Sequence, residues 1–319
     1  MAARAPRLRT LAALLVVGVA AAGAARRDPR PLPAQQQPTF RTESQLVVLH
    51  VRVKDRRGAY VTGLPQSAFT VFDEGVPQRI ALFSREDSPV TVGLLIDSSG
   101  SMYTGRERVV AAAAAFAAAS NPGDELFALL FNERVRTVLP PSMPFTSDPA
   151  LLSSALGDAG LAYGRTALYD AIAQGLAYVS RGSHPRRVLI VVADGGDNAS
   201  RTTFDDVLRQ AQASNAAIYT VGIIDPLERG ASRGRLRQLA QATGGEAFFP
   251  GGVGDVAEVL RHIARDIRHT YTIGYVPPAD RPAGTYRRLR VAVTVPDGRQ
   301  LEVRTRSGYL SGPGGRRSL

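Results

Sequence analysis

The sequence predicts an α/β protein in which a doubly wound, mostly parallel sheet is flanked by small antiparallel β segments. Between residues 90 and 268, continuous apolar runs alternate with helix-forming stretches, a pattern typical of a parallel sheet covered on both faces. On either side of this block, apolar and polar residues alternate one by one, which indicates half-buried strands. No internal repeat is present.

The α/β block is expected to contain four strands, at residues 90–97, 126–131, 188–193 and 218–223. Six helices are expected between and after them, at residues 106–120, 149–156, 167–180, 203–214, 233–243 and 253–268. Ligands of such sheets bind beyond the carboxyl ends of the strands, so that edge is where functional side chains are sought.

Two β segments flank the block. The first has predicted strands at residues 45–54, 69–73 and 78–84, with Glu74-Gly75 as a turn. The second has strands at 271–275, 286–295 and 301–306, and Pro296-Asp297-Gly298 predicts a hairpin between the last two. We hypothesise that both segments fold together as one sandwich into which the α/β domain is inserted.

The composition excludes several function classes. The chain has 319 residues, of which 44% are hydrophobic and 21% charged, so it can bury a large core. Cysteine is absent, which removes thiolate nucleophiles, cysteine-bound zinc, iron–sulfur clusters and disulfides. Lys54 is the single lysine, so a Walker-type phosphate loop is also excluded.

The N-terminus has the pattern of a secretory signal. Three arginines precede an apolar run at residues 11–22, and Ala22-Gly23-Ala24 resembles a signal-peptidase site. The alternative is an uncleaved membrane anchor, although the run is shorter than the ~20 residues of a spanning helix. The expected organisation is a signal peptide (1–24), a flexible tether (25–43), a first β segment (44–88), the α/β domain (89–269), a second β segment (270–310) and a tail (311–319).

Five oxygen-bearing side chains lie just after predicted strands or just before predicted helices. Asp97, Ser99 and Ser101 form a D-x-S-x-S string after the first strand, Thr166 precedes a helix, and Asp194 follows the strand at 188–193. In a doubly wound sheet these three loops share one edge, so the side chains can converge.

Two carboxylates and three hydroxyls, without nitrogen or sulfur, suit a hard divalent cation, Mg²⁺ first and Mn²⁺ next. With few protein charges around it, such an ion keeps a coordination position open for water or an incoming carboxylate. The alternative interpretation is structural: Ser101 and Thr166 as helix N-caps, the adjacent glycines as turn residues and Asp194 as a loop acid.

The motifs LLIDSSGSM and GRTALYD resemble those of a von Willebrand factor A domain, and the wider chain is similar to secreted bacterial proteins called VWFA-related, abundant in acidobacteria. The resemblance implies that Asp97, Ser99, Ser101 and Thr166 hold the cation of a metal-ion-dependent adhesion site (MIDAS) directly or through water, with Asp194 acting through water. It also implies that an acidic side chain of a partner protein completes the coordination shell. Gly195-Gly196 stands where a glycine–acid pair is expected, which can change the hydrogen bonding around the metal ligands.

An enzyme is the first competing interpretation. A haloacid-dehalogenase-type phosphotransferase needs a second acid where this chain has Ser99. A serine hydrolase needs a G-x-S-x-G elbow and a base, but His184 precedes a strand and belongs at the opposite sheet edge, while His262 and His269 lie on the last helix. Metal-assisted hydrolysis outside the cytoplasm, with Glu133 or Asp197 as base, is the alternative that stays open.

Nucleic-acid binding is the second competing interpretation. The net charge of +11 becomes +8 without residues 1–24, and four arginines cluster at positions 229, 233, 235 and 237. They lack interleaved aromatic residues or a nucleic-acid motif, so a solvated helix face is favoured. The sequence therefore predicts an extracytoplasmic, non-enzymatic interaction protein in the periplasm, at the cell surface or in the medium, which binds Mg²⁺ and grips an Asp or Glu of a partner protein.

Overall fold

The computed structural model describes residues 46–85, 87–159, 164–224, 232–278 and 282–311. The predicted signal peptide, the tether and all but the first residue of the predicted tail lie outside these residues. Within the described part of the chain, no helix is long and apolar enough to cross a membrane.

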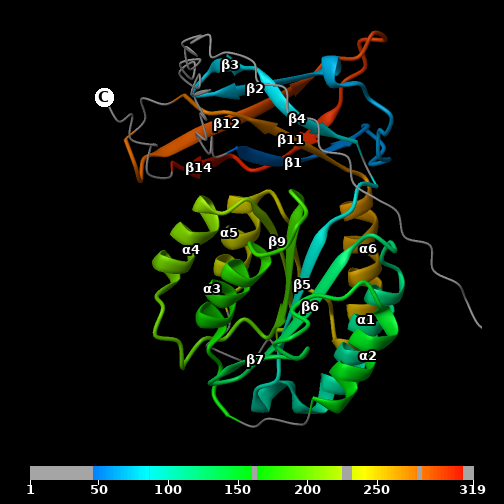
Figure 1. Cartoon of the computed structure of the whole chain (residues 1–319), viewed down its shortest axis with the longest axis vertical. Coiled ribbons are helices and arrows are strands. Elements are labelled where there is room, and N and C mark those ends of the chain that lie inside the picture. The colour runs from blue at the N-terminus through cyan, green and yellow to red at the C-terminus, as the bar shows by residue number, and fades with distance from the viewer. Residues whose placement is uncertain (1–45, 86, 160–163, 225–231, 279–281, 312–319) are drawn as a thin grey trace, which may run out of the picture. The chain divides into compact units, whose positions relative to one another are not determined.

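The centre of the α/β block is a six-stranded sheet with the strand order β10–β9–β8–β5–β6–β7 (Figure 1). All neighbours pair in parallel except β7, which is antiparallel to β6. Every residue of β5 is buried, because helices cover both faces of the strand. The six strands are β5 (Thr91–Asp97), β6 (Glu125–Phe131), β7 (Val135–Thr137), β8 (Arg187–Ala193), β9 (Ala216–Gly222) and β10 (Ala247–Phe248).

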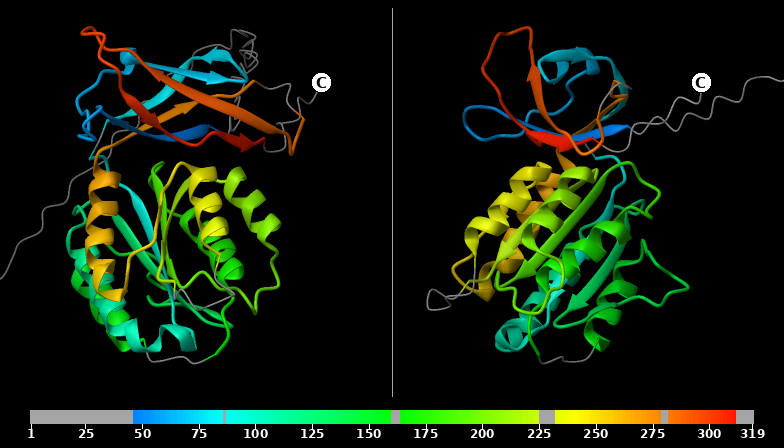
Figure 2. Two further views of the ribbon diagram at one scale, coloured as in Figure 1. Left: turned by 180° about the vertical axis from the view of Figure 1, so that it is seen from behind. Right: turned by 90° about the vertical axis from the view of Figure 1, so that its left-hand side faces the viewer.

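The helices form two layers, one on each face of the sheet (Figures 1 and 2). On one face, α1 (Arg106–Ala118), α2 (Pro149–Asp158) and α6 (Val256–Arg268) share a core with alternate residues of β5. On the other face, α3 (Leu168–Val179), α4 (Phe204–Ala213) and α5 (Arg233–Thr243) share a second core with the intervening residues. The sheet therefore lies between two apolar cores, one against each helix layer.

The flanking β segments pair with each other in two four-stranded sheets, ordered β13–β1–β11–β4 and β14–β12–β2–β3. One shared apolar core lies between the sheets. Strands from the two ends of the chain are direct neighbours in both, since β1 pairs with β11 and β2 with β12. The strands are β1 (Val47–Lys54), β2 (Phe69–Asp73), β3 (Val76–Gln78), β4 (Ile80–Ser84), β11 (Thr270–Tyr275), β12 (Tyr286–Val293), β13 (Glu302–Arg304) and β14 (Gly308–Leu310).

The predicted hairpin at Pro296-Asp297-Gly298 is wrong. The strands on its two sides enter different sheets: β12 pairs with β2 and β14, whereas β13 pairs with β1. The strand expected at 78–84 is β4, at Ile80–Ser84, and the short strand β3 before it lies in the other sheet. A local turn signal cannot distinguish a hairpin from a crossing between two packed sheets, because partner choice depends on the core that the sheets bury together.

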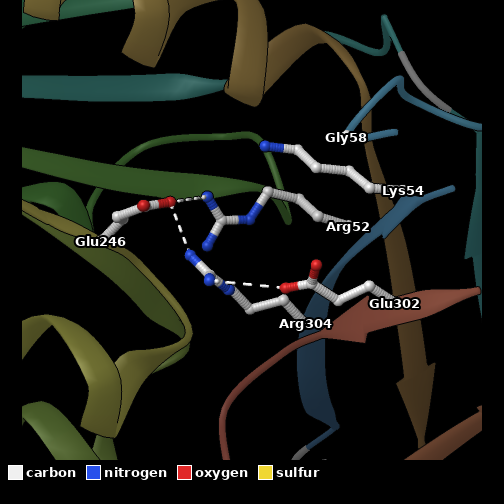
Figure 3. Close-up of a pocket in the computed structure, with 6 residues that line it drawn as sticks. All are labelled: Arg52, Lys54, Gly58, Glu246, Glu302 and Arg304. Carbon is white, nitrogen blue, oxygen red and sulfur yellow. Dashed lines mark hydrogen bonds and ion pairs between the residues drawn. The ribbon is translucent and has the colours of Figure 1, made fainter. Parts of the chain in front are cut away.

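A buried ionic cluster connects the sandwich to the α/β block. The guanidinium of Arg52 in β1 pairs with Asp266 of α6 and with Glu246, at 3.2 Å from the Glu246 carboxylate, and donates to the carbonyl of Gly244 at 2.9 Å. Asp266 is fully buried and also accepts a hydrogen bond from Tyr60. Figure 3 shows Arg52 and Arg304 both reaching the Glu246 carboxylate, with the Lys54 side chain beside Arg52. Lys54 Nζ lies 3.6 Å from the Asp266 carboxylate. The buried charges of Arg52 in the sandwich and Asp266 in the α/β block thus neutralise each other.

A second buried cation joins the same parts of the chain without a carboxylate partner among the described residues. Arg306 donates to the backbone carbonyls of Gln212, Ser214 and Gly308. Two of these carbonyls lie at the C-terminal end of α4, where the helix dipole favours a cation. Burial lowers the pKa of Arg306 to about 10, which still leaves it charged at neutral pH.

Removing the buried acid of the ionic cluster is expected to destabilise the fold. Asp266→Ala leaves Arg52 buried without its closest carboxylate, so we expect the free energy of unfolding to fall by about 3 kcal/mol, measured by urea denaturation. Asp297→Ala, which breaks an exposed ion pair with Arg299, is the control and should cost less than about 1 kcal/mol. Equal effects of the two substitutions would contradict the structural role of the cluster.

His50 makes the stability of this contact depend on pH. Its ring is buried, and burial, followed by the charges of Arg186, Arg306 and Arg52, lowers its pKa to about 4, although its hydrogen bond to Asn215 opposes the shift. The unfolded chain protonates His50 near pH 6.5, so stability falls as the pH drops from 6.5 towards 4.

Between pH 7 and pH 5 we expect this histidine to contribute a loss of about 2 kcal/mol in the free energy of unfolding. His50→Gln preserves a hydrogen-bond donor to Asn215 but cannot titrate, so its loss over the same interval should be smaller by that amount. Parallel pH curves for parent and variant would show that His50 is not buried in its neutral form.

Candidate functional site

The loops that carry the predicted metal ligands lie at the carboxyl edge of the parallel sheet. Asp97 is the last residue of β5, Asp194 directly follows β8, and Thr166 lies two residues before α3. The register aligns the ends of the neighbouring strands, with Asp97 opposite Phe131 of β6. The sequence-derived expectation that these loops share one edge therefore agrees with the topology.

Asp97 is a buried carboxylate with incomplete hydrogen bonding. Its Oδ1 accepts from the backbone amide of Ser99 at 2.8 Å, whereas its Oδ2 is buried and has no hydrogen-bond partner among the described residues. Burial and the nearby Asp194 carboxylate raise the pKa of Asp97 to about 7, against the opposing effect of hydrogen bonds from Ser99 and the Asp194 backbone. A buried, unsatisfied carboxylate oxygen is costly unless a cation or a proton reaches it.

Asp194 lies against Asp97 across the loop edge. It is buried, and its Oδ1 accepts from the backbone amide of Gly196 at 2.9 Å. Gly195, between Asp194 and Gly196, adopts a positive φ of 85°, which bends the chain so that the Gly196 amide faces the Asp194 carboxylate. The two glycines thus shape the loop around Asp194, and Gly196 supplies a backbone donor to it.

Thr166 is buried at the same edge and does not cap a helix. The N-cap of α3 is Ala167, which makes no side-chain capping bond, so the interpretation of Thr166 as an ordinary N-cap is wrong. Its backbone is fastened to the Asp194 loop: its amide donates to Asn198 Oδ1 at 2.8 Å, and its carbonyl accepts from the amides of Asn198 and Ala199. This places residue 166 beside the Asp194 loop.

The D-x-S-x-S segment continues into a short 3₁₀ helix, Gly100–Gly105, before α1. Ser99 is buried and bonded to Asp97, whereas at Ser101 the structure describes the backbone but not the side chain. Gly105, not Ser101, occupies the N-cap of α1. The role of the Ser101 hydroxyl stays a prediction.

Backbone hydrogen bonds connect the three loops with each other and with the turn after β6. The Gly100 amide donates to the Gly164 carbonyl at 3.3 Å, the Ala167 amide to the Asn132 carbonyl, and the Ser98 amide to the Phe131 carbonyl. Glu133 Oε1 accepts from the Arg165 amide. The structure therefore joins the Asp97, Thr166 and Asp194 loops, and the direct contact that it documents between predicted ligands is that of Asp97 with Ser99 and Asp194.

These residues fit a hard divalent cation. The donors are carboxylate and hydroxyl oxygens, and the unsatisfied Oδ2 of Asp97 is the atom that a cation would neutralise. No cluster of three or more His, Cys, Asp or Glu residues capable of holding a metal occurs among the described residues, so a nitrogen- or carboxylate-rich zinc site is not an alternative there. The predicted ligand set, with two acids and three hydroxyls, is of a different composition.

The histidines lie elsewhere. His184 precedes β8, and its Nε2 is 2.9 Å from the Gly123 carbonyl. His269 stacks on Tyr60 with ring centroids 4.5 Å apart, and His262 packs edge-on against Phe248. His262, within α6, and His269, the C-cap of α6, thus pack against aromatic rings.

Three further residues, Asn132, Asp170 and Asn198, brace the loops, a role that the sequence motifs do not predict. Asp170 accepts from the amides of Arg201 and Thr202, and its pKa is lowered because hydrogen bonds from Thr202 and Arg201 outweigh burial, the largest single influence. Their positions in the sequence could have indicated this role, because each lies within four residues of a predicted ligand or at the end of β6. Short polar side chains in such loops commonly bind backbone amides.

A family model for the von Willebrand factor type A domain matches residues 92–263, more than half of the chain. The chain therefore belongs to the von Willebrand factor type A domain family. The family match covers all the predicted metal ligands.

Similar solved structures include a von Willebrand factor type A protein from Catenulispora acidiphila, at 17% identity and a TM-score of 0.49, covering 86% of this chain and 75% of that one. The von Willebrand factor domain of the type V pilus tip protein Mfa5 from Porphyromonas gingivalis has 13% identity and a TM-score of 0.46, covering 56% and 95%. Proximal thread matrix protein 1 from the mussel byssus, with a zinc-occupied MIDAS motif, has 13% identity and a TM-score of 0.49, covering 59% and 47%. No curated protein matches the chain.

The buried carboxylate of Asp97 should weaken the metal-free fold. The pKa of Asp97 in the folded state is raised to about 7, so protonation of this carboxyl favours the folded state. This stabilisation is complete below about pH 4 and is lost as the pH rises towards 7. Asp97→Asn removes this charge, so in EDTA at pH 8 the variant should have a higher free energy of unfolding than the parent, by about 2–4 kcal/mol.

Adding Mg²⁺ should stabilise the parent and not the Asn variant, as measured by urea denaturation with and without the ion. A variant less stable than the parent in EDTA would mean that the Asp97 carboxylate is satisfied within the protein itself.

Proposed function

We propose that this chain is an exported, non-enzymatic interaction module that binds Mg²⁺ through Asp97, Ser99, Ser101, Thr166 and Asp194 and uses the ion to coordinate an Asp or Glu of a partner protein. The observation that carries this proposal is the buried Oδ2 of Asp97, a carboxylate oxygen to which no group of the described residues donates a hydrogen bond. Mn²⁺ is the second cation that the donor set suits.

The residues of the site have distinct roles in this proposal. Asp97 supplies the negative charge that attracts the cation, and the Ser99 amide fixes the orientation of its carboxylate. Asp194, held by the Gly196 amide, supplies a second charge at the same edge, and Asn198 holds Thr166 beside it. A bound divalent ion contributes a localised positive charge and an open coordination position, which a partner carboxylate can fill.

A hydrolase is less well supported. Its candidate bases are already engaged in holding the loops: Glu133 accepts from the Arg165 amide, and Asp197 accepts from the Tyr169 amide and the Ser200 hydroxyl. A general base must reach a water or a substrate proton, and these two carboxylates instead brace the backbone. Phosphatase, esterase and nuclease assays on the purified protein test this alternative directly.

The proposed destination is outside the cytoplasm. The support for it is the arginine-flanked apolar run at residues 11–22 with its small-x-small pattern. Mass spectrometry of the protein recovered from its native host would locate the mature N-terminus, which the proposal expects near residue 25.

Metal binding should depend strongly on Asp97 and less strongly on Asp194. Asp97→Ala removes the carboxylate with the unsatisfied oxygen, so we expect no measurable heat of Mg²⁺ binding by isothermal titration calorimetry. Asp194→Ala should reduce the affinity about 10- to 100-fold, the range typical of ligands that act through an outer contact.

Asp205→Ala, an exposed acid at the start of α4, is the matched control and should bind as the parent does. Unchanged Mg²⁺ affinity in the Asp97→Ala variant would overturn the metal assignment.

The partner itself can be sought with a pulldown in Mg²⁺ and again in EDTA. A true partner should be captured in Mg²⁺, be lost on chelation, and fail to bind the Asp97→Ala variant. Capture that is equal in all three conditions would reject a metal-mediated contact.

A further inference from the structure

Exposed arginines lie on or beside two of the loops that surround the proposed metal site and at the start of α5. Arg165 directly precedes Thr166, Arg201 follows the Asp194 loop, and Arg235 lies in the first turn of α5. α5 begins beside the same edge, because the Ser232 amide donates to the Gly195 carbonyl at 3.2 Å. None of these three arginines forms an ion pair with a carboxylate among the residues that the structure describes.

Arg235 is held in a fixed position. Its Nη1 donates to the Tyr169 hydroxyl at 2.9 Å, and its guanidinium lies over the rings of Phe204 and Tyr169, at 5.4 and 6.0 Å from their centroids. Tyr169 is in the first turn of α3, three residues from Thr166, and Phe204 is the first residue of α4. Stacking fixes the plane of a guanidinium while its remaining N–H groups stay available to a ligand.

Arg165 and Arg201 are fixed at the backbone and not at the side chain. The amide of Arg165 donates to Glu133 and that of Arg201 to Asp170 at 3.0 Å, so both Cα positions belong to the braced loops. Their side chains are exposed. They can therefore reach a partner without first breaking an ion pair to this chain's described carboxylates.

The acidic residues of this edge hold the loops through hydrogen bonds and form no ion pair with the three arginines among the described residues. Glu133, Asp170 and Asp197 each accept hydrogen bonds from backbone amides of the loops. Asp97 and Asp194 are buried, and in the proposed function their charges are offset by the bound cation. Arg165, Arg201 and Arg235 are exposed, whereas Asp170 and Asp197 are only partly exposed and Glu133 is an exposed acid of this edge.

We propose that the partner presents an acidic segment, in which the carboxylate that reaches the metal is flanked by further Asp or Glu residues that pair with Arg165, Arg201 and Arg235. This inference rests on the proposed function and specifies the chemistry of its partner. Guanidiniums recognise carboxylates through two parallel hydrogen bonds, and arginines placed around one central cation suit several carboxylates near each other.

The same surface is poorly suited to nucleic acid. Binding of single strands uses exposed aromatic faces on which bases stack, but here the rings of Tyr169 and Phe204 are covered by Arg235, and that of Phe249 by Arg233 and Arg237. Of the arginine cluster that the sequence analysis interpreted as a solvated helix face, the proposal assigns a role to Arg235.

Two synthetic Gly/Ser peptides of equal length test the proposal, one with a single central Glu and one with the same Glu flanked by Asp on both sides. Binding is measured by fluorescence anisotropy in Mg²⁺ at about 0.1 M salt. The flanked peptide should bind at least about tenfold more tightly, because each added pair with an exposed arginine contributes about two- to fivefold. This preference should shrink at about 1 M salt.

The variant Arg165→Gln/Arg201→Gln/Arg235→Gln should lose the preference while binding Mg²⁺ and the single-Glu peptide as the parent does. Arg290→Gln is the matched control, since Arg290 is exposed and stacks on Phe72 at 3.9 Å but lies on β12 of the sandwich. Thermal unfolding curves establish that the variants are folded.

The outcomes separate the two proposals. Peptide binding that persists in EDTA and in Asp97→Ala contradicts the proposed function. Mg²⁺-dependent binding with equal affinity for both peptides, or a preference that survives the triple substitution, contradicts the acidic-segment proposal alone. Metal-independent binding of a heparin oligosaccharide that competes with the flanked peptide would instead identify the arginines as a general polyanion surface and overturn the proposal.

Discussion

The functional interpretation depends on one electrostatic constraint. Two carboxylates, Asp97 and Asp194, are buried at the ends of adjacent parallel strands, and Oδ2 of Asp97 has no hydrogen-bond donor in the part of the chain that the structure describes. Burial is the main reason why the pKa of Asp97 is raised to about 7, and repulsion from the Asp194 carboxylate adds to it. A folded protein retains such an arrangement at a cost in stability. A divalent cation relieves both the repulsion and the missing hydrogen bond, so the cost and the proposed function have the same physical origin.

The rest of the fold holds this edge in place. The two apolar cores on the faces of the sheet fix the strand ends, and backbone hydrogen bonds between the loops position side chains that are far apart in sequence. The α/β block is joined to the sandwich by the buried Arg52–Asp266 ion pair and by hydrogen bonds from Arg306 to backbone carbonyls at the C-terminal end of α4. The strands of the sandwich come from both sides of the block, so the block is an insertion within it.

The sequence was sufficient to predict what local periodicity and strand order determine. The apolar runs predicted β5, β6, β8 and β9, and their alternation with helices predicted the shared loop edge. Partner choice among short strands was not predictable: β7, β10 and β14 have two or three residues each, and β12 and β13 separate into different sheets despite an Asp-Gly turn. Nor does the sequence reveal that Arg235 stacks on Phe204 and Tyr169, because this contact joins three helices. Such features depend on tertiary packing and leave no periodic signal.

The most direct test is a crystal structure of the protein soaked with Mn²⁺, with anomalous scattering used to locate the ion. The account predicts one anomalous peak at coordination distance, about 2.0–2.3 Å, from the Asp97 carboxylate, with Ser99 and Thr166 hydroxyls around it and a coordination position facing solvent. A peak elsewhere, such as among the carboxylates near Glu246, or a hydrogen-bond donor from the protein occupying the Asp97 Oδ2 position, would contradict it.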